Sequence, residues 1–575
     1  MFELTDSRRL TGPNLFSDDP GAVAEVNGPA NTPVAPVDGD PATLAERWRH
    51  HALALTQALG WGSRVISRAF SGGVSQYLSA PVDVLYAATE VNEAAWAACS
   101  AELTGQPAPD FDRALDRLRG LVAEEQNPAL LELKAAASQR RARFLSDDDF
   151  ASVGYGPGAL TWPVDQLPAP GDVAWDSVSN IPVGLVTGTN GKSTTVRLAA
   201  SVLTAAGRQT GVTSTDYIRV ADEIIDTGDY SGPGGARTLL RDQRVEVAVL
   251  EVARGGMLRR GLGVNQADAA VVTNVAADHL GEWGINSVAE MATAKFIVCR
   301  ALPPGKPLIL NAEDPASVEQ ARQAPANTKT IVWFSERENH PLVQSHCMNG
   351  GQAWVVSSGM ITRIHQGQPV AVVPVADVPV TLGGAAKYNV QNALAAAALC
   401  HALGATDQAI AHGLASFRGT PEENPGRGNF FEGKGIRVLV DFAHNEHGLT
   451  AIAETLARIP AKRRLVMIGQ AGDRTDELIA DLVKAALKAG PDHLMVVKLP
   501  GYERGRQPED VPRLIHQLAL EGGLSEARIE HAEDPVDGTR RALAWAREGD
   551  FLLLLALTQR GPCLNLVQRE LGQTG

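Results

Sequence analysis

The stretch that most constrains this chain is residues 187–195, which read Thr-Gly-Thr-Asn-Gly-Lys-Ser-Thr-Thr. An apolar run, 181–186, precedes it, and a helical pattern, 196–206, follows it. Strand, glycine-rich turn and helix in this order direct backbone N–H groups and the positive end of a helix dipole at an anion. The sequence therefore predicts a binding site for the phosphates of a nucleotide triphosphate.

Lys192 and Ser193 carry the charge and the hydroxyl that such a loop needs. The lysine can reach the β- and γ-phosphates, and the serine can ligate Mg²⁺. The usual pattern, G-x-x-x-x-G-K-[ST], requires a glycine at position 186, where Val186 stands; the first glycine is Gly188. The alternative interpretation is a chance glycine turn before a helix, which the flanking strand and helix patterns argue against.

Composition excludes several classes of protein. The net charge of −14 argues against a nucleic-acid binder that relies on a general positive field. No apolar run approaches the roughly 20 residues of a membrane span, and the amino terminus lacks a signal-peptide layout. Five cysteines stand far apart, without a C-x-x-C pair, which favours free thiols in a reducing cytoplasm. We therefore expect a cytoplasmic protein without nucleic-acid or membrane partners.

The 575 residues are enough for three or four domains of roughly 150 residues each. Residues 1–175 contain helical patterns at 41–59, 83–103 and 109–146 and end in a Gly/Pro-rich linker at 154–180. No catalytic constellation stands there, so we expect this domain to contact substrate, a second copy of the chain, or both. We predict an α/β fold, with a central parallel-sheet ATPase domain at 176–420 and a smaller Rossmann-like domain at 421–575.

Two predicted strands of the central domain end in groups that can bind a metal ion. Glu251 follows the apolar run 245–250, and His279 comes shortly after the run 269–273. Side chains at the carboxyl ends of parallel strands point into the ligand crevice. A salt bridge for Glu251 and a structural role for His279 are the alternatives. Their joint position near the phosphate loop favours Mg²⁺ binding.

Further polar groups follow other predicted strands and helices. Asn311 ends the run 307–310, and Asn389 shares a helix face with Asn392, where either could be a plain helix cap. The carboxy-terminal domain has no G-x-G-x-x-G after a strand, so nothing indicates a dinucleotide. Its strands are followed by Asp441 with His444, and by Arg474.

Taken in order, these motifs resemble the Mur ligase superfamily from about residue 180 to 575. The set comprises TGTNGKST, LEVARGG, TNVAADHLG, the lysine of MATAKF, NAEDP, N-x-x-N, PGR, DFAHN and GDR. Within the superfamily, the chain is most similar to the Mur-ligase-like half of the cyanophycin synthetases. The stretch 10–14 (LTGPN) also resembles the amino end of those enzymes. Those enzymes also contain an ATP-grasp domain. Only about 175 residues precede the phosphate loop here, so we expect one ATP site and one ligation.

The resemblance implies roles for individual residues. Lys192, His279 and Lys295 would be catalytic, and Lys295 matches a lysine that several family members carry as a carbamate bridging to Mg²⁺. The residues that would bind the metal ions are Ser193, Glu251, His279 and Lys295. Nucleotide contacts would come from Thr189, Asn190, Gly191, Lys192, Ser193, Thr194, Asn311, Asn389, Arg427, Asp441 and His444.

The resemblance also implies an activity, with ATP and Mg²⁺ as cofactors. We expect an ATP-dependent ligase that joins a carboxylate to an amine through an acyl phosphate, on amino-acid or peptidyl substrates. The first alternative is a degenerate ligase that acts as an ATP-dependent binding or scaffold subunit. The second is a plain phosphate-loop ATPase or small-molecule kinase, which would not need the Arg427 and Asp441 region.

Overall fold

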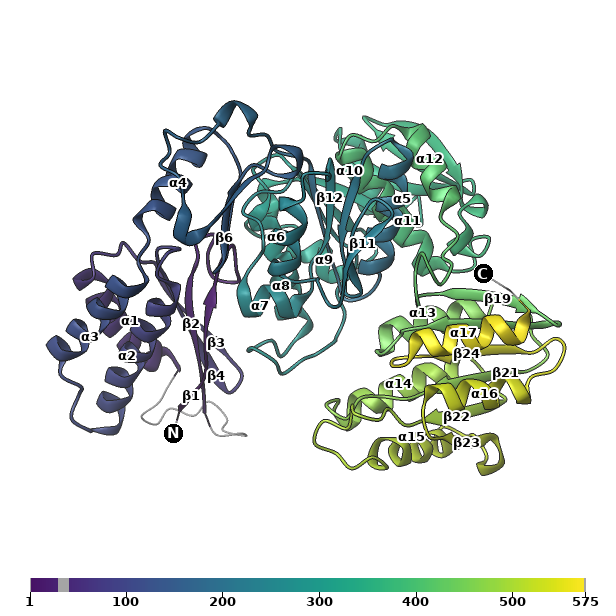
Figure 1. The fold of residues 1–575 in the computed structure, drawn as a ribbon. Coiled ribbons are helices and arrows are strands. Elements are labelled where there is room, and N and C mark those ends of the chain that lie inside the picture. The colour runs from purple at the N-terminus through teal and green to yellow at the C-terminus, as the bar shows by residue number, and fades with distance from the viewer. Residues whose placement is uncertain (1, 29–40, 573–575) are drawn as a thin grey trace. The chain divides into compact units, whose positions relative to one another are not determined.

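The computed structural model describes residues 2–28 and 41–572. They belong to two compact units, both built from sheets and helices (Figure 1). The first unit comprises 1–192, 203–333 and 398–406, and the second comprises 193–202, 334–397 and 407–575. Two helices, α5 (Lys192–Ala205) and α11 (Lys387–Ala402), contribute residues to both units.

The amino-terminal part of the first unit is an antiparallel sheet with helices packed against it. The strand order is β1-β2-β4-β3. The bounds are β1 Glu3–Leu10, β2 Gly21–Asn27, β3 Val65–Phe70 and β4 Gly73–Ser79. Helices α1 (Pro41–Ala58) and α2 (Leu85–Thr104) enclose a core that contains Trp48 and Trp96 (Figure 1). These helices confirm two of the predicted patterns, whereas the strands were not predicted.

The third helical pattern, 109–146, was wrong as a single stretch. It forms two helices, α3 (Phe111–Glu125) and α4 (Pro128–Gln139), before a small antiparallel sheet. The break has a local cause: the Asn127 side chain accepts from Leu130 N at 3.2 Å and so caps a new helix, whose first residue is a proline. The small sheet consists of β5 Phe144–Ser146, β6 Phe150–Val153 and β7 Leu160–Pro163.

The central sheet of the first unit has the order β11-β10-β9-β12-β8-β13-β14. Its strands are β8 Val183–Thr187, β9 Thr210–Thr213, β10 Tyr217–Val220, β11 Glu223–Thr227, β12 Val247–Glu251, β13 Ala269–Val272 and β14 Pro307–Asn311; β15 (Thr330–Ser335) follows in the chain. The helices are α6 Pro233–Arg241, α7 Arg254–Arg260, α8 Val288–Lys295 and α9 Pro315–Gln320. Strand β8 pairs in parallel with both β12 and β13. The strand patterns predicted around the phosphate loop are confirmed.

The second unit contains an antiparallel ladder and a carboxy-terminal sheet. The ladder consists of β16 Gln352–Ser357, β17 Met360–His365 and β18 Gln368–Pro374, with helices α10 (Pro341–Met348) and α12 (Asp407–Ser416) nearby in the chain. The sheet has the order β19-β20-β24-β21-β22-β23, in which β19 pairs antiparallel with β20 and the other neighbouring strands pair in parallel.

Helices cover both faces of the carboxy-terminal sheet, as a Rossmann-like domain requires (Figure 1). One face packs against α13 Glu446–Leu456, α14 Asp476–Lys488 and α15 Asp510–Glu521, and the other against α16 Pro535–Trp545 and α17 Arg560–Leu571. The strands are β19 Asn429–Gly433, β20 Ile436–Asp441, β21 Arg464–Ile468, β22 His493–Val497, β23 Ile529–Ala532 and β24 Phe551–Leu555. The predicted α/β class is confirmed. Among the described residues, none of the helices combines the length and apolarity needed to cross a membrane.

Candidate active site

The phosphate loop joins β8 to α5 and depends on two glycines. Gly188 has φ +150° and Gly191 has φ +84°, in a region that side chains rarely adopt. A Cβ atom at Gly188 would lie 1.8 Å from Thr273 Oγ1, so a larger residue would push the loop off the neighbouring segment. Val186, by contrast, is a fully buried residue of β8, paired with Glu251 and Val271 on its two neighbours. The glycine requirement therefore lies at 188 rather than at 186.

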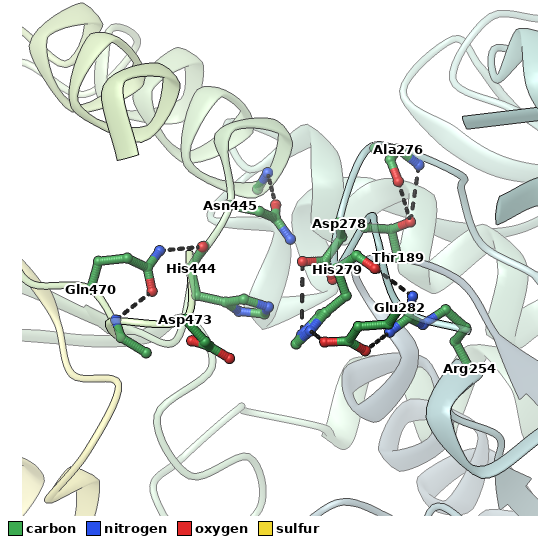
Figure 2. A network of polar contacts seen from close by, with 12 residues as sticks. Thr189, Arg254, Ala276, Asp278, His279, Glu282, His444, Asn445, Gln470 and Asp473 are labelled. Atoms are coloured by element: carbon green, nitrogen blue, oxygen red, sulfur yellow. Dashed lines mark hydrogen bonds and ion pairs between the residues drawn. The ribbon is translucent and has the colours of Figure 1, made fainter. Parts of the chain in front are cut away.

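The loop is held by the segment that follows β13. Thr189 N donates to Asn274 O and Asn190 N to Asn274 Oδ1, both at 2.9 Å. Thr189 Oγ1 exchanges hydrogen bonds with both the N–H and the carbonyl of Ala276, at 2.9 and 3.2 Å (Figure 2). These contacts fix the loop before any phosphate binds. Asn274 belongs to the 273–281 motif, but no role was predicted for it from the sequence.

Lys192 lies in the first turn of α5 and curls back over its own loop. Its Nζ donates to the carbonyls of Gly188 and Thr189, each at 3.1 Å. The next two residues of the turn, Ser193 and Thr194, are buried, and Asn424 Nδ2 donates to Thr194 Oγ1 at 3.4 Å. The backbone N–H groups of such a turn and its positive dipole end favour an anion.

Glu251 ends β12, directly beside β8 in the sheet. Its side chain is only 2% exposed, and its Oε2 accepts from Thr215 N at a long 3.4 Å. Its Oε1 has no hydrogen-bond partner among the described residues. A buried carboxylate oxygen without a partner carries a large desolvation cost, unless a cation or a donor from outside the protein meets it.

His279 lies in the loop after β13, in a left-handed conformation with φ +49°. Its Nδ1 is 3.2 Å from Glu282 Oε1, and its carbonyl accepts from Arg254 NH1 at 2.5 Å (Figure 2). Arg254 also forms an ion pair with Glu282. Asp278 Oδ1 lies 4.0 Å from His279 Nε2. The ring is therefore oriented by a carboxylate, which is how metal-binding histidines are commonly held.

The amino-terminal sheet supports the His279 loop from β3. Arg68 NH2 donates to Gly284 O and to Glu290 Oε1, both at 2.9 Å. Phe70 packs on Gly284 so closely that a Cβ there would lie 2.5 Å from the ring. Residues of the first domain thus position a loop of the central domain, a role that the sequence analysis did not assign to any of them.

Lys295 is the last residue of α8 and is 3% exposed. No hydrogen bond to its Nζ occurs within the part of the chain that the structure describes. Burial lowers the pKa of Lys295 well below its ordinary value, and the charges of Lys192 and Arg254 act in the same direction, against Asp278. An ammonium is therefore disfavoured at this position: burial favours the neutral amine, and the two neighbouring cations disfavour a further positive charge.

Asn311 and Asp314 brace the loops at the end of β14. Asn311 Nδ2 donates to Thr273 O at 3.4 Å, and its Oδ1 accepts from Glu313 N at 2.9 Å. Asp314 Oδ2 accepts from Val275 N at 2.9 Å and from Ser317 Oγ at 2.5 Å. Asp314 thereby anchors the segment that holds the phosphate loop. The NAEDP motif contained this signal, yet it carried no assignment for Asp314.

In the second unit, Asn389, Gly428 and Asp441 lie close together. A Cβ atom at Gly428 would lie 3.6 Å from Asn389 Nδ2 and 3.9 Å from Asp441 Oδ2. Asn389 is 3% exposed, and its amide is bonded to Val380 O at 2.8 Å and to Asn392 at 3.1 Å. Neither bond is the side-chain-to-backbone N–H contact of a helix cap, and Asn389 is the third residue of α11. The predicted nucleotide contact of Asn389 stays a prediction.

Asp441 ends β20, and its Oδ1 accepts from Ala443 N at 2.7 Å. Burial raises the pKa of Asp441 to about 6, although the positive charge of Arg427 acts to lower it. The Arg427 guanidinium lies 5.2 Å from the centre of the Phe442 ring. Arg427 and Asp441 thus share one electrostatic environment.

His444 and Asn445 follow in the same loop. Gln470 Nε2 donates to His444 O at 2.8 Å, and Asn445 Oδ1 accepts from Gly448 N at 2.9 Å and caps α13 (Figure 2). In the GDR motif, Asp473 pairs with Arg504 at 2.5 Å. The predicted contact of His444 with nucleotide stays a prediction.

Comparison with known proteins agrees with this geometry. Residues 186–400 match the Mur ligase middle domain, and residues 426–556 match the Mur ligase glutamate ligase domain. Together these matches cover more than half of the chain. The chain belongs to the Mur ligase family. The resemblance inferred from the motifs is therefore confirmed, and the fold class with it.

Among curated relatives, cyanophycin synthetase from Synechocystis is 36% identical over 59% of this chain and 38% of its own length. UDP-N-acetylmuramoyl-L-alanyl-D-glutamate–2,6-diaminopimelate ligase from Geobacillus kaustophilus is 27% identical over 64% of this chain and 72% of its own length. The chain thus spans about two fifths of the length of the cyanophycin synthetases that it matches.

Solved structures share the fold. E. coli FolC in complex with DHPP and ADP superposes with a TM-score of 0.50 at 21% identity, over 68% of this chain and 88% of that one. A bifunctional folylpolyglutamate synthase/dihydrofolate synthase with Mn, AMPPNP and L-glutamate bound gives 0.50 at 19% identity, over 67% and 89%. These likenesses concern the fold alone.

Arg68 provides the first test of the site. Arg68→Ala removes one hydrogen bond to Gly284 in the His279 loop and one to Glu290 in the following helix α8. Amide exchange in residues 277–287 should therefore accelerate by roughly tenfold. Hydrogen exchange followed by mass spectrometry measures this directly. Arg64→Ala, whose side chain is 67% exposed, is the matched control and should leave the loop unchanged. Equal exchange in both variants would contradict the supporting role.

Asp441 provides a test by pH. Its folded pKa of about 6 exceeds its ordinary value of 3.8, so ionisation disfavours the folded state and wild-type stability falls as pH rises between those values. Asp441→Asn lacks this effect. Relative to wild type, the variant should therefore gain on the order of 1 kcal/mol between pH 5 and pH 8. Thermal unfolding of both proteins at pH 5 and pH 8 measures the difference in stability between the variant and wild type. If that difference stays constant or decreases from pH 5 to pH 8, the pKa of Asp441 is not raised.

Proposed function

We propose that this chain is an ATP-dependent ligase that forms an amide between a carboxylate and an amine and releases ADP and phosphate. The observation that supports this best is the pairing of two features at adjacent parallel strands. A phosphate loop follows β8, and Glu251 ends β12 with a buried carboxylate oxygen, Oε1, that has no hydrogen-bond partner among the described residues. A carboxylate beside bound triphosphate is where a divalent cation is needed.

The residues present fit Mg²⁺. Glu251 supplies a buried oxygen ligand, Ser193 a hydroxyl in the first turn of α5, and His279 a ring that Glu282 orients. When bound, Mg²⁺ would neutralise charge on the β- and γ-phosphates. The assignment of these residues as ligands is part of the proposal.

Lys295 fits the proposed carbamate for a reason visible in its surroundings. The neighbouring charges of Lys192 and Arg254 disfavour an ammonium there, and they would favour an anion. The neutral amine attacks CO₂, forms an N–C bond and loses a proton, which yields the carbamate anion. Such a group could serve as a further metal ligand together with Glu251 and His279.

The chain's own groups then account for the reaction. Lys192, now bound to two carbonyls of its loop, can turn toward the γ-phosphate and stabilise the charge that develops there. The substrate carboxylate attacks the γ-phosphorus, the bond to the bridging oxygen breaks, and ADP leaves. A neutral amine attacks the resulting acyl phosphate, and a tetrahedral intermediate loses phosphate while the nitrogen loses a proton. The product is an amide.

The substrates are proposed by class. Family membership makes an amino-acid or peptidyl carboxylate the first choice, with an amino acid as the amine. Acidic carboxylate donors and basic amine acceptors should be screened first, because the cyanophycin synthetases are among the similar proteins.

The carbamate can be observed by carbon NMR. Enzyme exposed to ¹³C-bicarbonate and ATP should show one protected carbamate resonance, and Lys295→Arg should lack it. Because the pKa of Lys295 is lowered, its amine is neutral at lower pH than an exposed lysine, so the resonance should persist below pH 8. A wild-type spectrum without the resonance, under conditions in which the enzyme turns over, would exclude the modification.

If the chain is a ligase, ATP turnover should depend on two further substrates. ADP and phosphate should form only when both a carboxylate and an amine are supplied, and hydroxylamine should trap the acyl phosphate as a hydroxamate once the right carboxylate is present. Lys192→Ala should lower turnover by about two to three orders of magnitude while the fold stays intact. Coupled ADP assays and hydroxamate detection measure both effects.

The outcomes separate the alternatives. ADP release without amine dependence, with no hydroxamate from any carboxylate, would favour a plain ATPase. Nucleotide binding without any turnover in a broad screen would favour a scaffold subunit. A stable phosphorylated product would identify a kinase.

A further inference from the structure

A small polar pocket lies between the amino-terminal sheet and the central part of the first unit. Its walls come from the loop after β1, from α4, from β5 and from α6. The lining residues include Thr11, Lys134, Ser146, Arg237, Gly263 and Asn265. The conspicuous amino-terminal stretch 10–14, which the proposed reaction does not use, thus contributes one wall. None of the phosphate-loop residues lines this pocket.

Arg237 reaches the pocket from α6 and is only 8% exposed. Its NH2 donates to Thr11 Oγ1 at 2.5 Å. Among the described residues it has no carboxylate within ion-pair distance, although a buried guanidinium carries five donors. Burial lowers the pKa of Arg237, the expected sign for a cation without a close counter-charge. Charged groups are almost never buried in this way unless they are paired.

Lys134 adds a second cation from α4. It is partly buried and makes neither a hydrogen bond nor an ion pair within the described ranges. Burial lowers the pKa of Lys134 as well, and the distant carboxylates of Asp19 and Asp83 oppose that effect. Two cations therefore line one small polar pocket.

None of the nearby carboxylates forms an ion pair with Arg237 or Lys134 among the described residues. Asp147 pairs with Arg241 at 2.6 Å, and Asp148 pairs with Arg9 at 2.8 Å. Asp83 Oδ2 accepts from Asn127 N at 2.9 Å, while its Oδ1 has no hydrogen-bond partner among the described residues. Their charges act on Arg237 or Lys134 only from a distance. Within residues 2–28 and 41–572, the positive charge of the pocket is therefore left without a contacting anion.

We propose that this pocket binds a small oxyanion, a carboxylate or phosphate group, held between the guanidinium of Arg237 and the ammonium of Lys134. The planar fork of an arginine matches the two oxygens of such a group. The Thr11 hydroxyl fixes one side of the fork and leaves its other donors for the ligand. The pocket is small, so we expect it to hold a single such group.

Binding would also strengthen the attachment of the amino-terminal loop. Thr11 N donates to Arg260 O and Leu262 N to Pro13 O, both at 2.8 Å. Both pairs border the pocket, so an oxyanion that binds the folded chain would stabilise this junction by mass action.

Thermal unfolding of the full chain tests the proposal. All variants carry Lys192→Ala, which weakens any contribution from the phosphate loop, and sodium phosphate or sodium acetate replaces sodium chloride at constant ionic strength. At least one of the two oxyanions should raise Tm at millimolar concentration. Arg237→Gln and Lys134→Gln should each lose most of this rise, and titration calorimetry should show binding weakened roughly tenfold or more.

Arg208→Gln removes the same charge from an exposed position and should retain the full rise. Lys134→Gln keeps the bond between Arg237 and Thr11, so it remains informative if Arg237→Gln folds poorly. A rise with acetate alone identifies a carboxylate ligand, and a rise with phosphate alone identifies a phosphate. Equal rises with chloride, no rise at all, or an undiminished rise in Lys134→Gln would overturn the proposal. No turnover is needed, so the result is independent of the proposed ligase activity.

Discussion

The parallel pairing of β8 with β12 on one side and β13 on the other is the constraint on which the candidate site depends. Parallel strands present their carboxyl ends at one edge of a sheet, where α/β proteins bind their ligands. The phosphate loop and the 273–279 segment both begin at that edge, and Glu251 ends its strand there. Gly188 presses on Thr273 without room for a Cβ atom, so loop and neighbouring strand fit only in this register.

Buried charges in the first unit fall into two kinds. Arg8 has its counter-charge within the protein, because it pairs with Glu25 at 2.8 Å and Ser75 donates to the same carboxylate. Glu251 is buried with one carboxylate oxygen that has no partner among the described residues, and Lys295 is buried where an ammonium is disfavoured. A buried charge without a partner costs several kcal/mol. Such a buried group is understandable where a ligand supplies the missing counter-charge. A buried group without a partner is therefore a stronger sign of a binding site than burial alone or a motif alone.

Sequence reasoning succeeded where the signal was local and periodic. Apolar runs ending in polar groups located β8, β12, β13 and β14, and with them Lys192 and Glu251. It failed for the amino-terminal sheet, because β4 buries polar residues such as Ser75 and Gln76 and its pairing is long-range. Asn127 followed by a proline is a helix-start signal that the sequence contains. The helical composition on both sides outweighed it and led to the prediction of a single helical stretch. The roles of Arg68 and Asp314 depend on partners 216 and 39 residues away, which no local pattern reveals.

The amino-terminal sheet is best understood as part of the wall of the central domain. Arg8 Nε donates to Leu258 O at 3.0 Å, Thr11 N to Arg260 O at 2.8 Å, and Arg68 to Gly284 O at 2.9 Å. Two of these carbonyls belong to α7, which also carries Arg254, and the third belongs to the loop of His279. Arg254 joins the two by donating to the His279 carbonyl. His279 has an unfavourable left-handed backbone, which persists only where surrounding contacts determine it. Those contacts come from α7 and from β3, so the amino-terminal sheet helps set the geometry of the His279 loop.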